Sequence, residues 1–181
     1  MDKPSVQERQ KPLREEYATS PGAAMVTDHA RTTGVRADDP FHCDVYPMPT
    51  VGVRVPVGVH RAVGGLHDAP TPGDLLCAAL AACQDSTFRM IANIMNVELE
   101  ELTVDVTAKV DVRGTLLIES SVHIGFQSMH SEVRYRAKPG TSKDQLAMLE
   151  KLAERCCIVR QTLKGGVPIE TVFTAMAPSG Q

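Results

Sequence analysis

The chain has 181 residues, 43% of them hydrophobic, so it can form one domain with a core of its own. Its formal net charge of −3 and its aromatic content of 4%, without Trp, argue against a nucleic-acid partner, which would require a basic surface or stacking rings. No stretch approaches 18 uninterrupted apolar residues and Met1–Gln10 has no apolar core, so we expect neither a membrane span nor a secretory signal.

The first part of the chain predicts an extension followed by short strands. Residues 1–20 are polar and interrupted by proline, which predicts an N-terminal extension with a short helix near 13–17 ahead of a single domain over 21–181. Short β-like runs follow within 23–35, around Val45 and over 51–57. The breaker-rich stretch 64–70 predicts a loop.

A long helix is predicted from Thr71 to about Met95. Thr71 is a suitable N-cap, Pro72 suits the first helical position, and Asn96 is a plausible stop. Residues 75–83 are apolar on every side, which predicts burial of all faces of the helix. One small domain seldom surrounds a helix completely, so we expect a partner subunit to cover the remaining face.

The second half predicts strands around another helix. Apolar and polar residues alternate over 101–112, which predicts a half-buried strand before a turn at Gly114. Further on, the apolar residues change from even-numbered to odd-numbered positions, which predicts a β-bulge between Gln127 and Glu132. Ser142 and Gln145 predict a capped helix that continues to Gly165–Gly166, and a last strand is expected over 167–175. The order of elements predicts an α+β fold.

Two cysteines, Cys83 and Cys157, stand 74 positions apart, each in a helix-like apolar stretch and neither in a CxxC motif. If the fold brings them together, they can cycle through a disulfide; otherwise they are small buried apolar residues. Neighbouring residues project about 100° apart on a helix, so only one of Cys156 and Cys157 can face Cys83. We treat Cys77 as core.

The wider cysteine pattern favours the cytoplasm and gives little support for a metal site. An odd count of five cysteines without a secretory signal predicts a cytoplasmic protein with reduced thiols. His42-Cys43 is a weak metal motif because no second cluster accompanies it, so we expect no metal and no cofactor.

A thiol buried in the middle of a helix reacts only if something lowers its pKa. Cys83 is far from the N-terminus of its own predicted helix, so we expect a cationic partner, preferably an arginine. The candidates are Arg31, Arg36, Arg61 and Arg89, and composition does not choose among them.

Two motifs resemble those of the OsmC/Ohr family of osmotically inducible and organic hydroperoxide resistance proteins. Thr71-Pro72-Gly73-Asp74-Leu75-Leu76 followed by Ala78-Ala79-Leu80-Ala81-Ala82-Cys83 resembles the first cysteine motif of the family. The stretch from Glu154 to Leu163 resembles the second, which usually has Cys-Pro-Val and then Thr-Leu. The resemblance covers about residues 22–177.

The resemblance implies an intertwined α+β homodimer in which two β-sheets wrap around long central helices. It implies a thiol-dependent peroxidase that reduces organic hydroperoxides, and H2O2 less well. Cys83 and Cys157 would be the redox pair, restored by a dithiol reductant such as a lipoylated or thioredoxin-like protein. Thr33-Gly34-Val35-Arg36 resembles a Thr-Gly-Gly-Arg stretch of the family, so Arg36 is the implied thiolate-activating cation.

The chain also departs from the family pattern. Ala62 stands where an active-site Glu that orients the Arg is expected, and Asp68 is the acid considered as its replacement. Ile158 replaces the usual Pro, and Cys156 is an additional thiol.

Three hypotheses remain. The first is a peroxidase that works through Cys83 and Cys157. The second is a non-catalytic dimer that senses redox state or binds a small ligand, in which the missing Glu reflects lost catalysis. In the third, both cysteines only pack.

Overall fold

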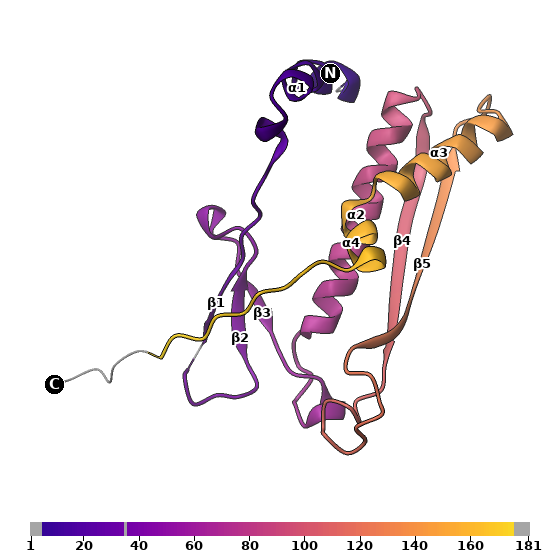
Figure 1. The fold of residues 1–181 in the computed structure, drawn as a ribbon. Coiled ribbons are helices and arrows are strands. Elements are labelled where there is room, and N and C mark those ends of the chain that lie inside the picture. Colours follow the sequence, from indigo (N-terminus) through magenta and orange to yellow (C-terminus); the bar gives the residue numbers. More distant parts are fainter. Residues whose placement is uncertain (1–4, 35, 176–181) are drawn as a thin grey trace.

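The computed structural model describes residues 5–34 and 36–175, which form helices and two antiparallel sheets (Figure 1). The α+β class expected from the order of elements is confirmed. The helices are α1 (Val6–Thr19), α2 (Pro72–Ile94), α3 (Lys143–Cys156) and α4 (Ile158–Gly165), and the strands are β1 (Arg31–Gly34), β2 (Cys43–Tyr46), β3 (Val55–Val57), β4 (Leu99–Val110) and β5 (Phe126–Ala137). Short 3-10 turns cover Pro21–Ala24, Pro49–Val51 and Arg61–Val63.

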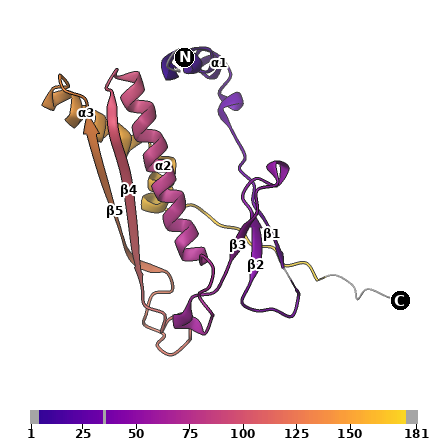
Figure 2. The ribbon, with the colours of Figure 1, turned by 180° about the vertical axis from the view of Figure 1, so that it is seen from behind.

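The main body is the long helix α2 packed along the β4–β5 hairpin, with α3 and α4 against it (Figures 1 and 2). Both predicted helix starts are confirmed, because Thr71 and Ser142 each cap a helix through a complete capping box. Asn96, the expected stop of α2, takes a left-handed conformation with φ 55°. The core lies where α2, the start of β4 and α3 meet, and its buried members are Phe88, Ala92, Val97, Leu149 and Ala153.

The alternation predicted over 101–112 is present in β4, where even-numbered residues from Leu102 to Ala108 face inward. The β-bulge expected between Gln127 and Glu132 lies at Gln127, the first residue of that stretch. Lys109 pairs with Ser128 and Val110 with Phe126, so Gln127 has no partner, and pairing is regular from Ser128 to Glu132. Residues 111–125 form the connecting loop, and the unpaired Gln127 shifts the inward-facing positions of β5 from even (Phe126) to odd (Met129).

The prediction of a single helix from Ser142 to Gly165 is wrong, because the chain forms two helices here. The helix breaks at Cys157, which has extended dihedral angles (φ −73°, ψ 107°), ends α3 and caps α4. The Gln161 side-chain amide donates to the carbonyls of Glu154 and Arg155 at 3.0 and 3.3 Å. These bonds satisfy carbonyls at the end of α3 and so stabilise the break.

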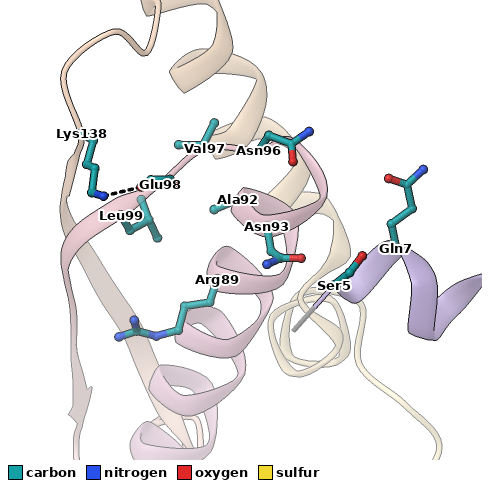
Figure 3. A pocket seen from close by; sticks show the side chains of 10 residues that line it. All are labelled: Ser5, Gln7, Arg89, Ala92, Asn93, Asn96, Val97, Glu98, Leu99 and Lys138. Carbon is teal, nitrogen blue, oxygen red and sulfur yellow. Dashed lines mark ion pairs between the residues drawn. The ribbon is translucent and has the colours of Figure 1, made fainter. Parts of the chain in front are cut away.

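The N-terminal part stands apart from this body. Strands β1, β2 and β3 form a separate three-stranded sheet, and α1 lies beyond it towards the far end of α2 (Figures 1 and 2). The Val6 N–H donates to the Asn93 side-chain oxygen at 2.9 Å, which ties α1 to α2 beside a small cavity (Figure 3). Helix α1 is longer than the short helix predicted near 13–17.

Much apolar surface is uncovered in the single chain. Only Leu80, Phe88 and Ala92 of α2 are buried, although burial of all its faces was expected. Helix α2 is long and apolar enough to cross a membrane. The central helices of soluble proteins meet the same criteria of length and composition. Residues 167–175 pair with no strand, so the last predicted strand is absent from the described chain; Phe173 is 92% exposed.

The core predicts where truncation will cost most. Leu149→Ala should lower the free energy of unfolding by about 2–5 kcal/mol, because Leu149 is fully buried and its loss leaves a cavity. Met148→Ala, at an exposed position of the same helix, is the matched control and should change it far less. Urea denaturation of both variants measures the difference, and equal losses would mean that α3 does not pack as described.

Candidate functional site

The fold brings Cys83 and Cys157 together. Cys83 lies in the middle of α2 and is half-buried, whereas Cys157 is fully buried at the α3–α4 break. The Cys157 thiol is a hydrogen-bonding partner of the Cys83 sulfur, so the two residues form an adjacent thiol pair. Both are free thiols.

The N-terminus of α4 points at Cys83. The main-chain N–H groups of Val159 and Ile158 donate to its sulfur, and so does the Thr87 hydroxyl one turn further along α2. These amides have no acceptor within their own helix, because they lie in its first turn. The positive end of the α4 dipole therefore faces a sulfur that can become an anion.

These contacts make the two thiols unequal. Burial alone would raise the pKa of Cys83, but hydrogen bonds from Val159, the Cys157 thiol, Thr87 and Ile158 outweigh it and lower the pKa. For Cys157, burial raises the pKa, and its hydrogen bond to Cys83 and the nearby Cys83 charge raise it further. Cys83 is thus the favoured thiolate, and Cys157 the thiol that stabilises it.

Arg36, the arginine implied as the activating cation, lies in the three-stranded part of the chain, just after β1. Its side chain is 70% exposed and pairs with Asp38 at 3.3 Å. The described structure therefore does not bring it to the thiols within one chain. Of the other candidates, Arg89 pairs with Asp85 on the outside of α2 at 2.7 Å.

Asp68, considered as a replacement for the missing acid, contacts a histidine. Its carboxylate lies 3.2 Å from His42 Nε2, and Asp39 lies 2.9 Å from His42 Nδ1. These contacts join the β1–β2 loop to the loop before α2. Ala62 lies in the 3-10 turn between β3 and α2, and its N–H is capped by the His60 ring.

The other cysteines differ in setting. Cys156 is exposed at the end of α3, while Cys43 and Cys77 are half-buried. Burial raises the pKa of Cys77, in keeping with its expected packing role. Within residues 5–34 and 36–175, His, Cys, Asp and Glu form no group of three suited to a metal ion.

An open groove of about 1160 Å³ is lined by α2, β5, α3 and α4. Leu80 and Gln84 contribute from the helix that carries Cys83, and Arg160 contributes from the helix that Cys157 caps. The cavity beside α1, of about 570 Å³, lies at the other end of α2 and is lined by polar groups, including the Lys138–Glu98 ion pair (Figure 3). The groove borders all three helices that meet at the thiol pair, whereas the cavity beside α1 borders only α2 among them.

A model of OsmC-like proteins matches residues 65–172, which is more than half of the chain and includes both cysteines. The chain belongs to the OsmC-like family. A search of curated proteins found no match.

Solved structures of the family share the fold. An OsmC-like protein from Mycoplasma pneumoniae has a TM-score of 0.61 at 13% identity, covering 78% of this chain and 89% of its own. An organic hydroperoxide resistance protein OsmC from Legionella pneumophila has 0.55 at 20% identity, covering 78% and 91%. An organic hydroperoxide resistance protein from Elizabethkingia anophelis has a TM-score of 0.56 at 22% identity, and the match covers 78% of this chain and 91% of its own. At these identities the likeness establishes the OsmC-like fold alone.

Sequence reasoning did not identify the groups that surround Cys83 in this OsmC-like chain. The sequence predicted a cation beside Cys83, whereas the structure supplies the amides of Ile158 and Val159 and the Thr87 hydroxyl. One signal was present: the family usually has Pro at the position of Ile158, and Pro is frequent at the first residue of a helix. Ile158 is indeed the first residue of α4.

Thr87→Val should raise the pKa of Cys83, because it removes a hydroxyl that stabilises the thiolate. Alkylation of Cys83 near pH 7 should become severalfold slower, since the thiolate is the reactive form. The control is Ser86→Ala, whose hydroxyl bonds instead to main-chain carbonyls of Ala82 and Cys83. Iodoacetamide labelling across pH, read by mass spectrometry, measures both; identical profiles for the two variants would contradict the assignment.

The His42 contacts predict a pH-dependent contribution to stability. Hydrogen bonds to Asp39 and Asp68 raise the pKa of His42 above its unfolded value. The extra stability is therefore fully present below about pH 6.5 and is lost as pH rises through the folded pKa.

His42→Gln should remove part of the difference in unfolding free energy between pH 5.5 and pH 8, whereas His29→Gln, at an exposed position before β1, should leave it unchanged. Urea titrations at the two pH values measure this. A difference retained in full by His42→Gln would show that this contact does not contribute.

Proposed function

We propose that this OsmC-like protein is a cytoplasmic thiol-dependent peroxidase that reduces organic hydroperoxides, and H2O2 less well, through Cys83 and Cys157. The observation that carries the proposal is the half-buried Cys83 sulfur at the N-terminus of α4, with a lowered pKa and a buried thiol beside it. The names of the Legionella and Elizabethkingia structures, which are organic hydroperoxide resistance proteins, support the same class of substrate.

In the first step the Cys83 thiolate attacks the terminal oxygen of the hydroperoxide. An S–O bond forms as the O–O bond breaks, the alkoxide takes a proton from solvent and leaves as the alcohol, and Cys83 becomes a sulfenic acid. The amides of Ile158 and Val159 would stabilise the thiolate before the attack. The more accessible position of Cys83 also favours it as the thiol that meets substrate.

In the second step the Cys157 sulfur attacks the Cys83 sulfur and expels water. The Cys157 thiol loses its proton, a disulfide forms, and the hydroxide of the sulfenic acid leaves as water with that proton. Because Cys157 already contacts Cys83, little movement is required. A dithiol reductant, such as a lipoylated or thioredoxin-like protein, would then supply two electrons and restore both thiols.

We further propose that the working form is an intertwined homodimer. The uncovered apolar faces of α2 and the exposed 167–175 segment are surfaces that a second copy would bury. Arg36 would reach a thiol pair only if the three-stranded sheet of one chain approaches the other chain, because it is exposed and engaged with Asp38 here.

A non-catalytic dimer that senses redox state or binds a small ligand is the second candidate. Ala62 stands where the family's Glu is expected and favours this candidate, because an alanine side chain cannot orient an arginine. It shares the thiol pair but not turnover, so kinetic measurements separate the two candidates.

With dithiothreitol or a lipoylated reductant, the protein should consume cumene hydroperoxide catalytically. Cys83→Ser should reduce the rate to that of the uncatalysed reaction, because the nucleophile is lost. Cys157→Ser should allow one turnover and accumulate a sulfenic acid that dimedone traps. Cys156→Ser is the matched control and should retain turnover. Full turnover by Cys83→Ser would overturn the mechanism, and background consumption by folded wild type would favour the sensor.

A further inference from the structure

Arg160 was not among the arginines considered from the sequence, yet it lies beside the buried thiol. It is in the first turn of α4, three residues after Cys157, and its main-chain N–H donates to the Cys157 sulfur. Its positive charge also acts on that sulfur and lowers the pKa of Cys157, against the burial that raises it. It thus contacts the resolving thiol through its backbone and acts on it through its side-chain charge.

The Arg160 side chain is held in place. Its guanidinium forms an ion pair with Glu154 on the last turns of α3, across the break at Cys157. Only 29% of the side chain is exposed, compared with 54–70% for six other arginines that pair with carboxylates: Arg36, Arg54, Arg89, Arg113, Arg134 and Arg136. A fixed, shielded charge acts more strongly on its neighbours than a solvated one.

Glu154 does not cancel this charge at the thiol. Its side chain is 60% exposed, so solvent screens the carboxylate more than the guanidinium. The other charged groups lining the same groove are Glu150 of α3, Lys164 of α4 and the histidines of the β5 side, His123 and His130. Arg160 is the one among them whose charge acts on Cys157.

We propose that Arg160, held by Glu154, is the positioning residue that stabilises negative charge on Cys157 whenever the Cys83–Cys157 disulfide is made or broken. This rests on the redox pairing of the proposed function. It assigns to the resolving thiol an Arg–Glu pair made within one chain, separate from the exposed Arg36.

The role follows from the direction of thiol exchange. A dithiol attacks the more accessible sulfur, that of Cys83; the S–S bond breaks and Cys157 leaves as a thiolate that later takes a proton. The second thiol of the reductant then displaces Cys83 and leaves as the oxidised cyclic disulfide. A nearby positive charge makes Cys157 a better leaving group, and in the reverse sense makes it easier to deprotonate for attack on the sulfenic acid.

The test uses the full-length protein oxidised with diamide, so it does not depend on peroxidase activity. Reduction of its disulfide by dithiothreitol should be about fivefold slower in Arg160→Gln, as expected for loss of one partly shielded charge next to the leaving sulfur. Arg160→Lys, which keeps the charge, should recover part of the rate. Lys164→Gln removes a charge one turn further along the same groove and should react as wild type.

A second readout separates charge from structure. In a Cys83→Ser background, the pH profile of Cys157 alkylation should move to higher pH with Arg160→Gln and not with Lys164→Gln. Urea denaturation verifies that each variant is folded. Unchanged reduction rates and alkylation profiles in folded Arg160→Gln would overturn the proposal, as would an equal effect of Lys164→Gln. Failure of the diamide-treated wild type to form the disulfide would instead overturn the redox pairing itself.

Discussion

The break between α3 and α4 at Cys157 is the constraint on which the site depends. A continuous helix would bond the amides of residues 158 and 159 to carbonyls four residues earlier. The break frees those amides, and the Cys83 sulfur accepts from them. Gln161 meanwhile satisfies carbonyls at the end of α3. A single interruption of the backbone therefore supplies the positive field that a buried mid-helix thiol lacks.

The same geometry makes the two thiols unequal. One shared proton between adjacent sulfurs favours a single anion, because two negative charges in contact repel each other. Amides from α4 and the Thr87 hydroxyl place that anion on Cys83, while burial keeps Cys157 protonated. The more exposed sulfur is thus the better nucleophile, and the buried one is protected until its neighbour is oxidised. In the proposed cycle, the order of the two steps follows from this asymmetry.

How far the sequence predicts the molecule depends on the range of the interactions involved. Caps at Thr71 and Ser142 and the alternation along β4 are local, and they were predictable residue by residue. The break at Cys157 was not, because the apolar stripe of α3 runs through Cys156 and Cys157 and no Pro or Gly interrupts it. Resemblance to a family with Pro at the Ile158 position was the available signal. Arg160 and Thr87 acquire their roles only once α4 has turned towards α2, which no local pattern encodes.

The groups that activate Cys83 come from one chain, whereas the exposed apolar surfaces of that chain need a second chain to cover them. The groups that stabilise the Cys83 thiolate all come from α2 and the α3–α4 break, so one chain suffices for them. The apolar faces of α2 and the extended segment 167–175 remain uncovered in that same chain. A strand needs a neighbouring strand to pair its backbone groups. The alternating apolar residues Val167, Ile169 and Phe173 would form the buried face of such a strand only if another chain paired with it. Association of two chains would meet both needs and would exclude water from a sulfur whose thiolate form the chain already favours. A partner in this arrangement shapes access to the thiol pair, and the chain's own backbone sets its reactivity.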